Sequence, residues 1–231
     1  MQVRPIPGLE QLPWAEVWFH EVDDERWRAA SEAARAIGKD GLEVWTTDRT
    51  PEVAVFFEER GYEEVRRYYL TALDVAAAPD PGEPELPLVT LAERPDLLSE
   101  LYALAQVAYA DQPGRDGTRI PPFDVWRTWF DGQPHDACFI ALDGERVLGY
   151  GFLTVDGDTG KHGFTGVARD ARRAGVGTAI KRAQIAWAKA NGLRRLETAT
   201  EARLDGMRRL NQRYGYRPLY AEIILRGPLA P

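Results

Sequence analysis

The sequence predicts an α/β (α+β) fold, in which helices cover both faces of a mixed sheet. The first observation is that strand-like and helix-like segments alternate over residues 86–225 in the order β-α-α-β-β-β-α-β-α-β. The second is a shorter run of the same alternation over residues 15–75. The chain has 231 residues, of which 44% are hydrophobic, so it can bury such a core without disulfides or metal ions.

A proline-rich segment divides the chain. Residues 76–87 hold four prolines and one glycine, with no large apolar residue before Leu86. Such a composition does not form the interior of a helix or strand, because proline lacks a backbone N–H and both residue types favour turns. We therefore predict a first domain over residues 1–75, a linker over residues 76–87 and a second domain over residues 88–231.

Each element of the second domain carries a local signal. Apolar side chains at helical spacing mark its helices, Pro121 and Pro122 suit a helix start, and Gly192 suits a helix end. Turn residues at 143–144 and 156–160 separate the strands of a meander. The predicted strands are residues 86–91, 137–142, 147–155, 162–167, 193–200 and 219–225. The predicted helices are residues 95–109, a segment that begins at Pro121, about 176–191, and 205–214.

The first domain repeats part of this pattern. The predicted strands are residues 15–19, 42–45 and 64–75, and the predicted helices are residues 24–37 and 52–60. Lys39-Asp-Gly-Leu-Glu43 is similar to Ala190-Asn-Gly-Leu-Arg194, and Phe57-Glu-Glu-Arg-Gly-Tyr62 to Asn211-Gln-Arg-Tyr-Gly-Tyr216. We interpret this as a weak internal repeat whose first copy lacks the opening strands. The alternative is that two unrelated α/β stretches both end their helices with glycine.

Composition argues against several kinds of protein. The net charge of −7 argues against nucleic acid as the main partner, and no apolar run reaches the roughly 18 residues that span a bilayer. The three histidines and the one cysteine, Cys138, show no metal-binding spacing and allow no intrachain disulfide. We expect Cys138 to lie in the core rather than to act as a nucleophile. We expect a cytoplasmic protein that binds neither membranes nor nucleic acid.

The segment before the long helix has the composition of an anion site. Gly175 and Gly177 permit close approach to the backbone where a strand turns into a helix. The first N–H groups of that helix point outwards at the positive end of its dipole, and Arg172 and Arg173 add charge beside them. Plain turn chemistry is the alternative. No Gly-Lys-Ser/Thr follows, and Ile180 stands where a dinucleotide fingerprint needs its third glycine.

These residues also resemble a known family. Arg172-Arg173-Ala174-Gly175-Val176-Gly177 matches the R/Q-x-x-G-x-G/A coenzyme A signature of the GNAT N-acetyltransferase superfamily. Gly192-Leu193 and the run from Met207 through Asn211 to Gly215-Tyr216 are similar to the tail common in its members. The resemblance covers about 140 residues of the second domain and, in degraded form, the first. It implies a tandem arrangement whose first GNAT-like lobe is truncated.

The resemblance implies a mixed, mostly antiparallel, twisted sheet and an acyltransferase. The expected activity is acetyl-CoA-dependent N-acetyl transfer to a primary amine of a small molecule or of a peptide N-terminus, by direct attack on the thioester. A backbone N–H near Val167 would hold the oxyanion, and strand residues would pair with the pantetheine arm. The implied cofactor-binding residues are Gly166, Val167, Ala168, Arg172, Arg173, Ala174, Gly175, Val176, Gly177, Thr178 and Asn211.

The residues for proton transfer are less well defined. Many GNAT members place a tyrosine, the acid for the thiolate, four residues before the glycine that ends the last helix, where this chain has Asn211. Tyr214 is therefore the candidate acid, although a packed tyrosine is the alternative. Glu197 and His162, on the strands flanking the long helix, are the candidate bases. Which of them faces the cleft depends on strand register.

Other departures from the family leave the function open. Thr200 and Leu204 stand where related sequences often carry asparagine. The acidic run at residues 21–25 lies where the first lobe would need a phosphate loop, so this lobe is expected to bind no coenzyme. A catalytically silent acyl-CoA-binding module is the alternative function. Trp126, Trp129 and Phe130 line either the acceptor pocket or the core.

The protein is expected to be a monomer or a homodimer.

Overall fold

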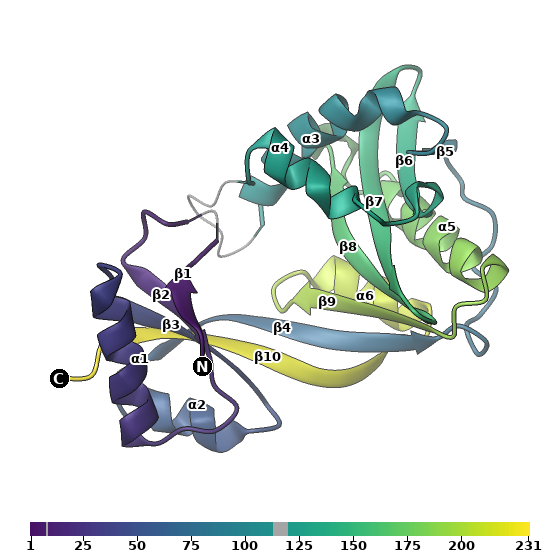
Figure 1. The fold of residues 1–231 in the computed structure, drawn as a ribbon. Coiled ribbons are helices and arrows are strands. Elements are labelled where there is room, and N and C mark those ends of the chain that lie inside the picture. The colour runs from purple at the N-terminus through teal and green to yellow at the C-terminus, as the bar shows by residue number, and fades with distance from the viewer. Residues whose placement is uncertain (8, 113–119) are drawn as a thin grey trace. The chain divides into compact units, whose positions relative to one another are not determined.

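The computed structural model describes residues 1–7, 9–112 and 120–231 (Figure 1). It divides into two compact units. The first contains Met1–Leu70, Thr200–Arg203 and Leu219–Pro231, and the second contains Thr71–Ala199 and Leu204–Pro218. The division of the chain into two domains at residues 76–87 stays a prediction. The first unit contains residues from both sides of that segment.

The first unit is a sheet packed against two helices (Figure 1). Its strands follow the order β1-β2-β3-β10-β4, with β2 and β3 parallel and both β1–β2 and β3–β10 antiparallel. Leu42, Val44 and Phe57 are fully buried between the sheet and the helices. The strands are β1 (Val3–Pro5), β2 (Trp14–Trp18), β3 (Gly41–Thr47), β4 (Glu63–Asp74) and β10 (Arg217–Pro228). The helices are α1 (Asp24–Ala36) and α2 (Pro51–Glu58).

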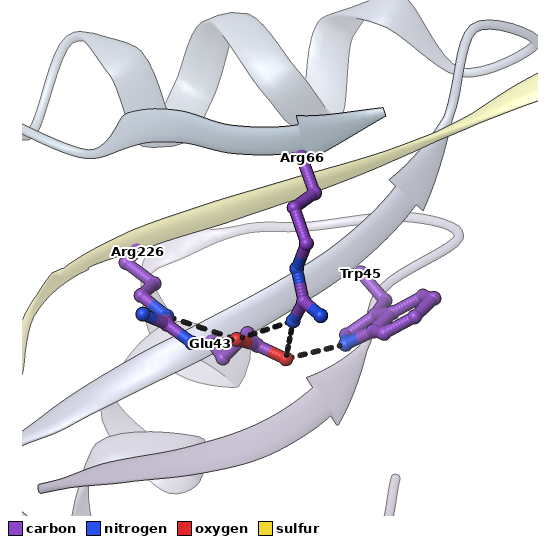
Figure 2. Close-up of polar contacts among 4 residues, drawn as sticks. All are labelled: Glu43, Trp45, Arg66 and Arg226. Carbon is purple, nitrogen blue, oxygen red and sulfur yellow. Dashed lines mark hydrogen bonds and ion pairs between the residues drawn. The ribbon is translucent and has the colours of Figure 1, made fainter. Parts of the chain in front are cut away.

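A buried carboxylate ties three of these strands together (Figure 2). Glu43 of β3 is fully buried, and the Nη2 of Arg66 lies 3.0 Å from each of its oxygens. Arg226 of β10 donates from Nε at 2.9 Å, and the Trp45 indole donates at 3.1 Å. Because removing one member of a buried ion cluster leaves an uncompensated charge, the cluster holds β10 in the first unit.

The second unit is a sheet with helices on both faces. Its strands follow the order β9-β8-β7-β6-β5, antiparallel from β5 to β8 and parallel between β8 and β9. Ile140 packs with α3 and α4, whereas its neighbour Ala141 packs with α5, because side chains alternate along a strand. The helices α3 and α4 lie on one face of this sheet and α5 on the other (Figure 1). The strands are β5 (Leu88–Thr90), β6 (Cys138–Asp143), β7 (Arg146–Asp156), β8 (Thr159–Val167) and β9 (Arg195–Glu201). The helices are α3 (Leu98–Ala110), α4 (Phe123–Trp126), α5 (Val176–Ala190) and α6 (Asp205–Arg213).

The predicted fold class, a mixed and mostly antiparallel sheet flanked by helices, is confirmed. The order β2-α1-β3-α2-β4 of the first half recurs as β8-α5-β9-α6-β10 in the second. Two elements differ most from the prediction: β1 was not predicted, and the helix after Pro122 has four residues before it tightens into the 3-10 turn Arg127–Phe130. Within the described ranges, no helix is long and apolar enough to cross a bilayer.

Candidate active site

The loop before α5 is shaped by two left-handed residues. β8 ends at Val167, and the 3-10 turn Arg169–Ala171 leads into the loop. Arg173 has φ 68° and Gly175 has φ 86°, and Arg173 is the one non-glycine residue with positive φ in the described part of the chain. Gly175 is the N-cap of α5 and supplies no side-chain hydrogen bond to it. The first N–H groups of α5 therefore keep their capacity to bind an anion.

This loop opens onto a cavity of about 350 Å³. A Cβ atom added at Gly175 or Gly177 would meet no other atom within 4 Å, so a ligand can approach the backbone closely at both positions. The loop forms one wall and α6 forms the other. The lining residues are Val167, Ala171, Arg172, Arg173, Gly175, Val176, Gly177, Thr178, Gly206, Met207, Arg209, Leu210 and Arg213.

The cavity wall carries positive charge from both sides. Arg172 and Arg173 come from the loop, and Arg209 and Arg213 come from α6. The two arginines of α6 were not predicted as site residues, although their spacing of four residues on a helix puts them on one face. Guanidinium groups around a loop with unpaired backbone N–H groups favour a phosphate or pyrophosphate ligand.

The edge of β8 is open next to this cavity. The ladder between β8 and β9 covers three residue pairs and ends at Lys161↔Glu197, whereas β8 continues to Val167. On its other edge β8 remains paired with β7, with Gly166 opposite Tyr150 and Val167 opposite Gly149. The two parallel strands thus separate beyond residue 161, and an extended ligand arm can pair with β8 there as an added strand does.

His162 and Glu197 lie on opposite faces of the sheet. The His162 ring is buried on the α5 side, with Nδ1 2.9 Å from the Gln184 side-chain oxygen and Nε2 2.5 Å from the Tyr216 hydroxyl. Burial, and then the nearby charge of Lys181, lower the pKa of His162 well below its usual value, so this ring is neutral near pH 7. Leu196 points into the α5-side core, so Glu197 faces the other way.

Glu197 is the more accessible of these two candidates. Its side chain is 28% exposed, and a carboxylate oxygen lies 2.7 Å from Nε of Arg195 on the same strand. It stands opposite Lys161, at the last residue pair before β8 and β9 separate. Its position therefore suits contact with a ligand at the open edge better than that of the enclosed His162 ring.

Tyr214 and Asn211 lie behind the cavity wall. Tyr214 is 5% exposed, packs in the core next to Leu210, and accepts a hydrogen bond from Nε of Arg182 at 2.9 Å. Asn211 is buried on α6. The α6 residues that line the cavity near them are Leu210 and Arg213. The bond from Arg182 still allows the Tyr214 O–H to donate its proton, so the obstacle to a role as the acid is that Tyr214 does not line the cavity.

A buried lysine lies one turn into α5. Lys181 is 4% exposed, and its Nζ lies 5.3 Å from the centre of the Tyr216 ring. Burial lowers the pKa of Lys181 to about 7. Sequence reasoning missed this residue, because lysine on an amphipathic helix normally faces solvent.

The remaining candidate residues lie in or against the core on the α3 side of the sheet. Trp126 and Phe130 are buried in the α3-side core, and Trp129 packs against it. Cys138 lies in the same core, and burial raises the pKa of its thiol to about 12. Among the residues that the structure describes, no cluster of histidine, cysteine and acidic side chains could hold a metal ion.

Comparisons with known proteins identify the family to which this fold belongs. The model of the acetyltransferase (GNAT) family matches residues 98–216, just over half of the chain. A GCN5-related N-acetyltransferase from Sphaerobacter thermophilus has a TM-score of 0.77 at 18% identity, covering 99% of this chain and 76% of that one. A tandem GNAT protein from the clavulanic acid biosynthesis pathway has a TM-score of 0.68 at 19% identity, covering 95% and 76%.

A third solved structure, a GCN5-related N-acetyltransferase from Kribbella flavida, has a TM-score of 0.59 at 20% identity and covers 94% of this chain and 82% of that one. No curated protein sequence matches the chain. Because the similarity to the Sphaerobacter structure extends over nearly the whole chain, the N-terminal region also has a GNAT-like fold. With a family model spanning the cavity, the open β8 edge and both flanking helices, the chain belongs to the acetyltransferase (GNAT) family.

Proposed function

We propose that the protein is an acetyl-CoA-dependent N-acetyltransferase that acts on the primary amine of a small molecule or of a peptide N-terminus. One observation carries this proposal. The loop at residues 172–177 leaves the start of α5 without a side-chain cap and opens onto an arginine-lined cavity. The cavity lies beside the end of β8 that is not paired with β9. This combination suits a ligand that has a pyrophosphate at one end and an extended amide arm at the other.

The residues present fit coenzyme A. Backbone N–H groups of residues 173–178 would bind the pyrophosphate, helped by the arginine side chains of the cavity wall. The backbone of Val167 would pair with the pantetheine arm, because the N–H of the next residue, Ala168, bonds to Leu148 of β7 and alternate residues face the open edge. The N–H of Val167 would stabilise the oxyanion. Bound acetyl-CoA would supply a thioester carbonyl that an amine can attack directly.

Two proton transfers remain for the protein. An amine with a pKa above about 9 is mostly protonated near neutral pH, so a group must take its proton before attack. We propose Glu197 for this role, directly or through water, because it faces away from the α5-side core at the point where β8 and β9 separate. His162 would then hold Tyr216 and Gln184 in place.

Replacing Glu197 by glutamine tests this assignment. The rate near pH 7 should fall about 100-fold, the usual size of a general-base effect, and should partly recover at higher pH where free amine is abundant. The measurement is the pH–rate profile of the variant next to that of His162→Ala. If neither profile differs in shape from the wild type, solvent or the substrate supplies the base.

The proposed activity itself is tested by a thiol-release assay. Acetyl-CoA is incubated with the full chain and a panel of small amines and short peptides, and free thiol is measured together with acetylated product. Thiol release that depends on an amine and matches the amount of acetylated amine supports the transferase. Coenzyme binding without amine-dependent release across the panel would favour the alternative, a silent acyl-CoA-binding module.

One observation supports that alternative. Tyr214, the candidate acid for the thiolate, is engaged by Arg182 and lies outside the cavity lining. In the alternative, the same loop and cavity would bind the coenzyme, and the protein would act through binding alone.

Calorimetry should give one equivalent of coenzyme A per chain. In the first unit, Asp23 caps α1 by accepting a hydrogen bond from the backbone N–H of Arg26 at 2.8 Å, and Asp24 and Glu25 follow in the first turn. These carboxylates satisfy the helix dipole and repel a pyrophosphate. A stoichiometry near two would contradict a coenzyme-free first unit.

A further inference from the structure

One carboxylate holds two arginines of the coenzyme loop. Asp111 is the C-cap of α3, and its side chain is 19% exposed. It accepts two hydrogen bonds from Arg169, at 2.8 Å from Nε and 2.5 Å from Nη2. It also accepts one from Nη2 of Arg172 at 2.5 Å. These arginines hold the pKa of Asp111 well below its usual value, so the group is charged throughout the physiological range.

Arg172 is a cavity residue whose guanidinium is already engaged. Besides the bond to Asp111, its Nε donates to the backbone oxygen of Val167 at 3.3 Å. A phosphate oxygen and a carboxylate oxygen make the same kind of charge-assisted hydrogen bond to a guanidinium. Asp111 therefore holds an N–H group of Arg172 that a phosphate of the coenzyme can also use.

The two anions also repel each other. A pyrophosphate held at residues 173–178 would lie next to Arg172, and Asp111 is within hydrogen-bonding distance of that side chain. Like charges close together oppose binding unless one of them moves or its arginine partner is shared. Arg169 stays bound to Asp111 by two hydrogen bonds, so the carboxylate keeps a partner when Arg172 turns away.

We propose that Asp111 is an internal competitor for the coenzyme: it binds Arg172 in the empty site and releases it to a coenzyme phosphate. Asp111 thus sets the affinity for the coenzyme and favours its departure after reaction. This inference rests on the proposed coenzyme site. The opposite role, in which Asp111 holds Arg172 in its binding position, predicts an effect of the opposite sign.

The test is the affinity of Asp111→Asn for coenzyme A, measured by calorimetry on the full chain at low salt. We expect the dissociation constant to fall about five- to tenfold, because one charged competitor is removed. Asp111→Ala should do the same, and thermal melting shows that both variants remain folded. In an Arg172→Gln background, Asp111→Asn should change the affinity less than about twofold, because the competition acts through Arg172.

Asp170→Asn is the matched control. Asp170 lies in the 3-10 turn next to Arg169 and pairs with Arg146 at 2.7 and 2.5 Å, so its replacement changes the net charge equally without freeing Arg172. Tighter binding by the Asp111 variants than by this control supports the proposal. Equal or weaker binding overturns it while leaving the coenzyme site intact. If no variant and no wild-type protein binds coenzyme A, the proposed function fails as well.

Discussion

Replacing Gly177 by valine is expected to weaken coenzyme A binding by about 100-fold or more, because a side chain there displaces a phosphate from several backbone hydrogen bonds. Gly177 lies in the first turn of α5 and lines the cavity. An added Cβ meets no atom within 4 Å, so the fold can accept it and only the ligand's space is filled. The measurement is calorimetry with coenzyme A.

Gly177 is a better position for this test than Gly175. At Gly175 the φ of 86° would strain any β-branched residue, so lost binding there could come from a distorted loop. Alanine at position 177, which the signature allows, should leave binding nearly unchanged, whereas valine and leucine should weaken it stepwise with side-chain size. The melting temperature of these variants should be no lower than that of the wild type, because glycine is a poor helix former. Wild-type affinity in the valine variant would move the coenzyme elsewhere.

Replacing Lys181 by methionine is expected to stabilise the protein by roughly 2–4 kcal/mol near pH 7, because folding then no longer buries a group that prefers to be charged. The wild-type pKa falls from 10.5 to about 7 on folding. Between these values the unfolded chain binds more protons than the folded one, so the wild-type free energy of unfolding rises with pH. Urea unfolding at several pH values measures it.

The pH dependence separates this effect from improved packing. The advantage of the Lys181→Met variant should be largest near pH 7 and should shrink as the pH rises through 10.5, above which both states of the wild type become neutral. The pKa of His162 is lowered from 6.5 on folding, so this group changes the free energy of unfolding only below about pH 6.5. That range lies outside the one between pH 7 and 10.5 in which Lys181 acts. Lys189→Met, an exposed lysine on the same helix, is the control and should show no such slope. A pH-independent gain would mean that Lys181 is not desolvated.

Much of the fold was predicted because its signals are local. Helix α5 was predicted at residues 176–191 and is observed at Val176–Ala190, since its apolar face and Gly192 define it within one segment. Strand β10 was predicted at residues 219–225 but extends over Arg217–Pro228, where it pairs with β3. A partner so far away in the sequence cannot be recognised from local pattern. The three-residue strand β1, which contains Pro5, escapes for the same reason.

The residues of the candidate site were likewise predictable only where their signals are local. The loop at residues 172–177 was recognisable because backbone conformation and the first turn of a helix are local properties. Asp111, Arg209 and Arg213 come from other elements, and only the fold brings them to the loop. The faces of His162 and Glu197 depended on strand register, which the sequence leaves open and the pairing of Lys161 with Glu197 defines.

Hydrogen exchange with and without coenzyme A tests the central claim most directly, because it locates the bound ligand along the chain. We expect slower exchange at the amides of residues 173–178 and at that of Val167, and no change at the start of α1, where Asp23 already caps the helix. Protection confined to the first unit, or no protection of the loop before α5 at saturating coenzyme A, would contradict the account.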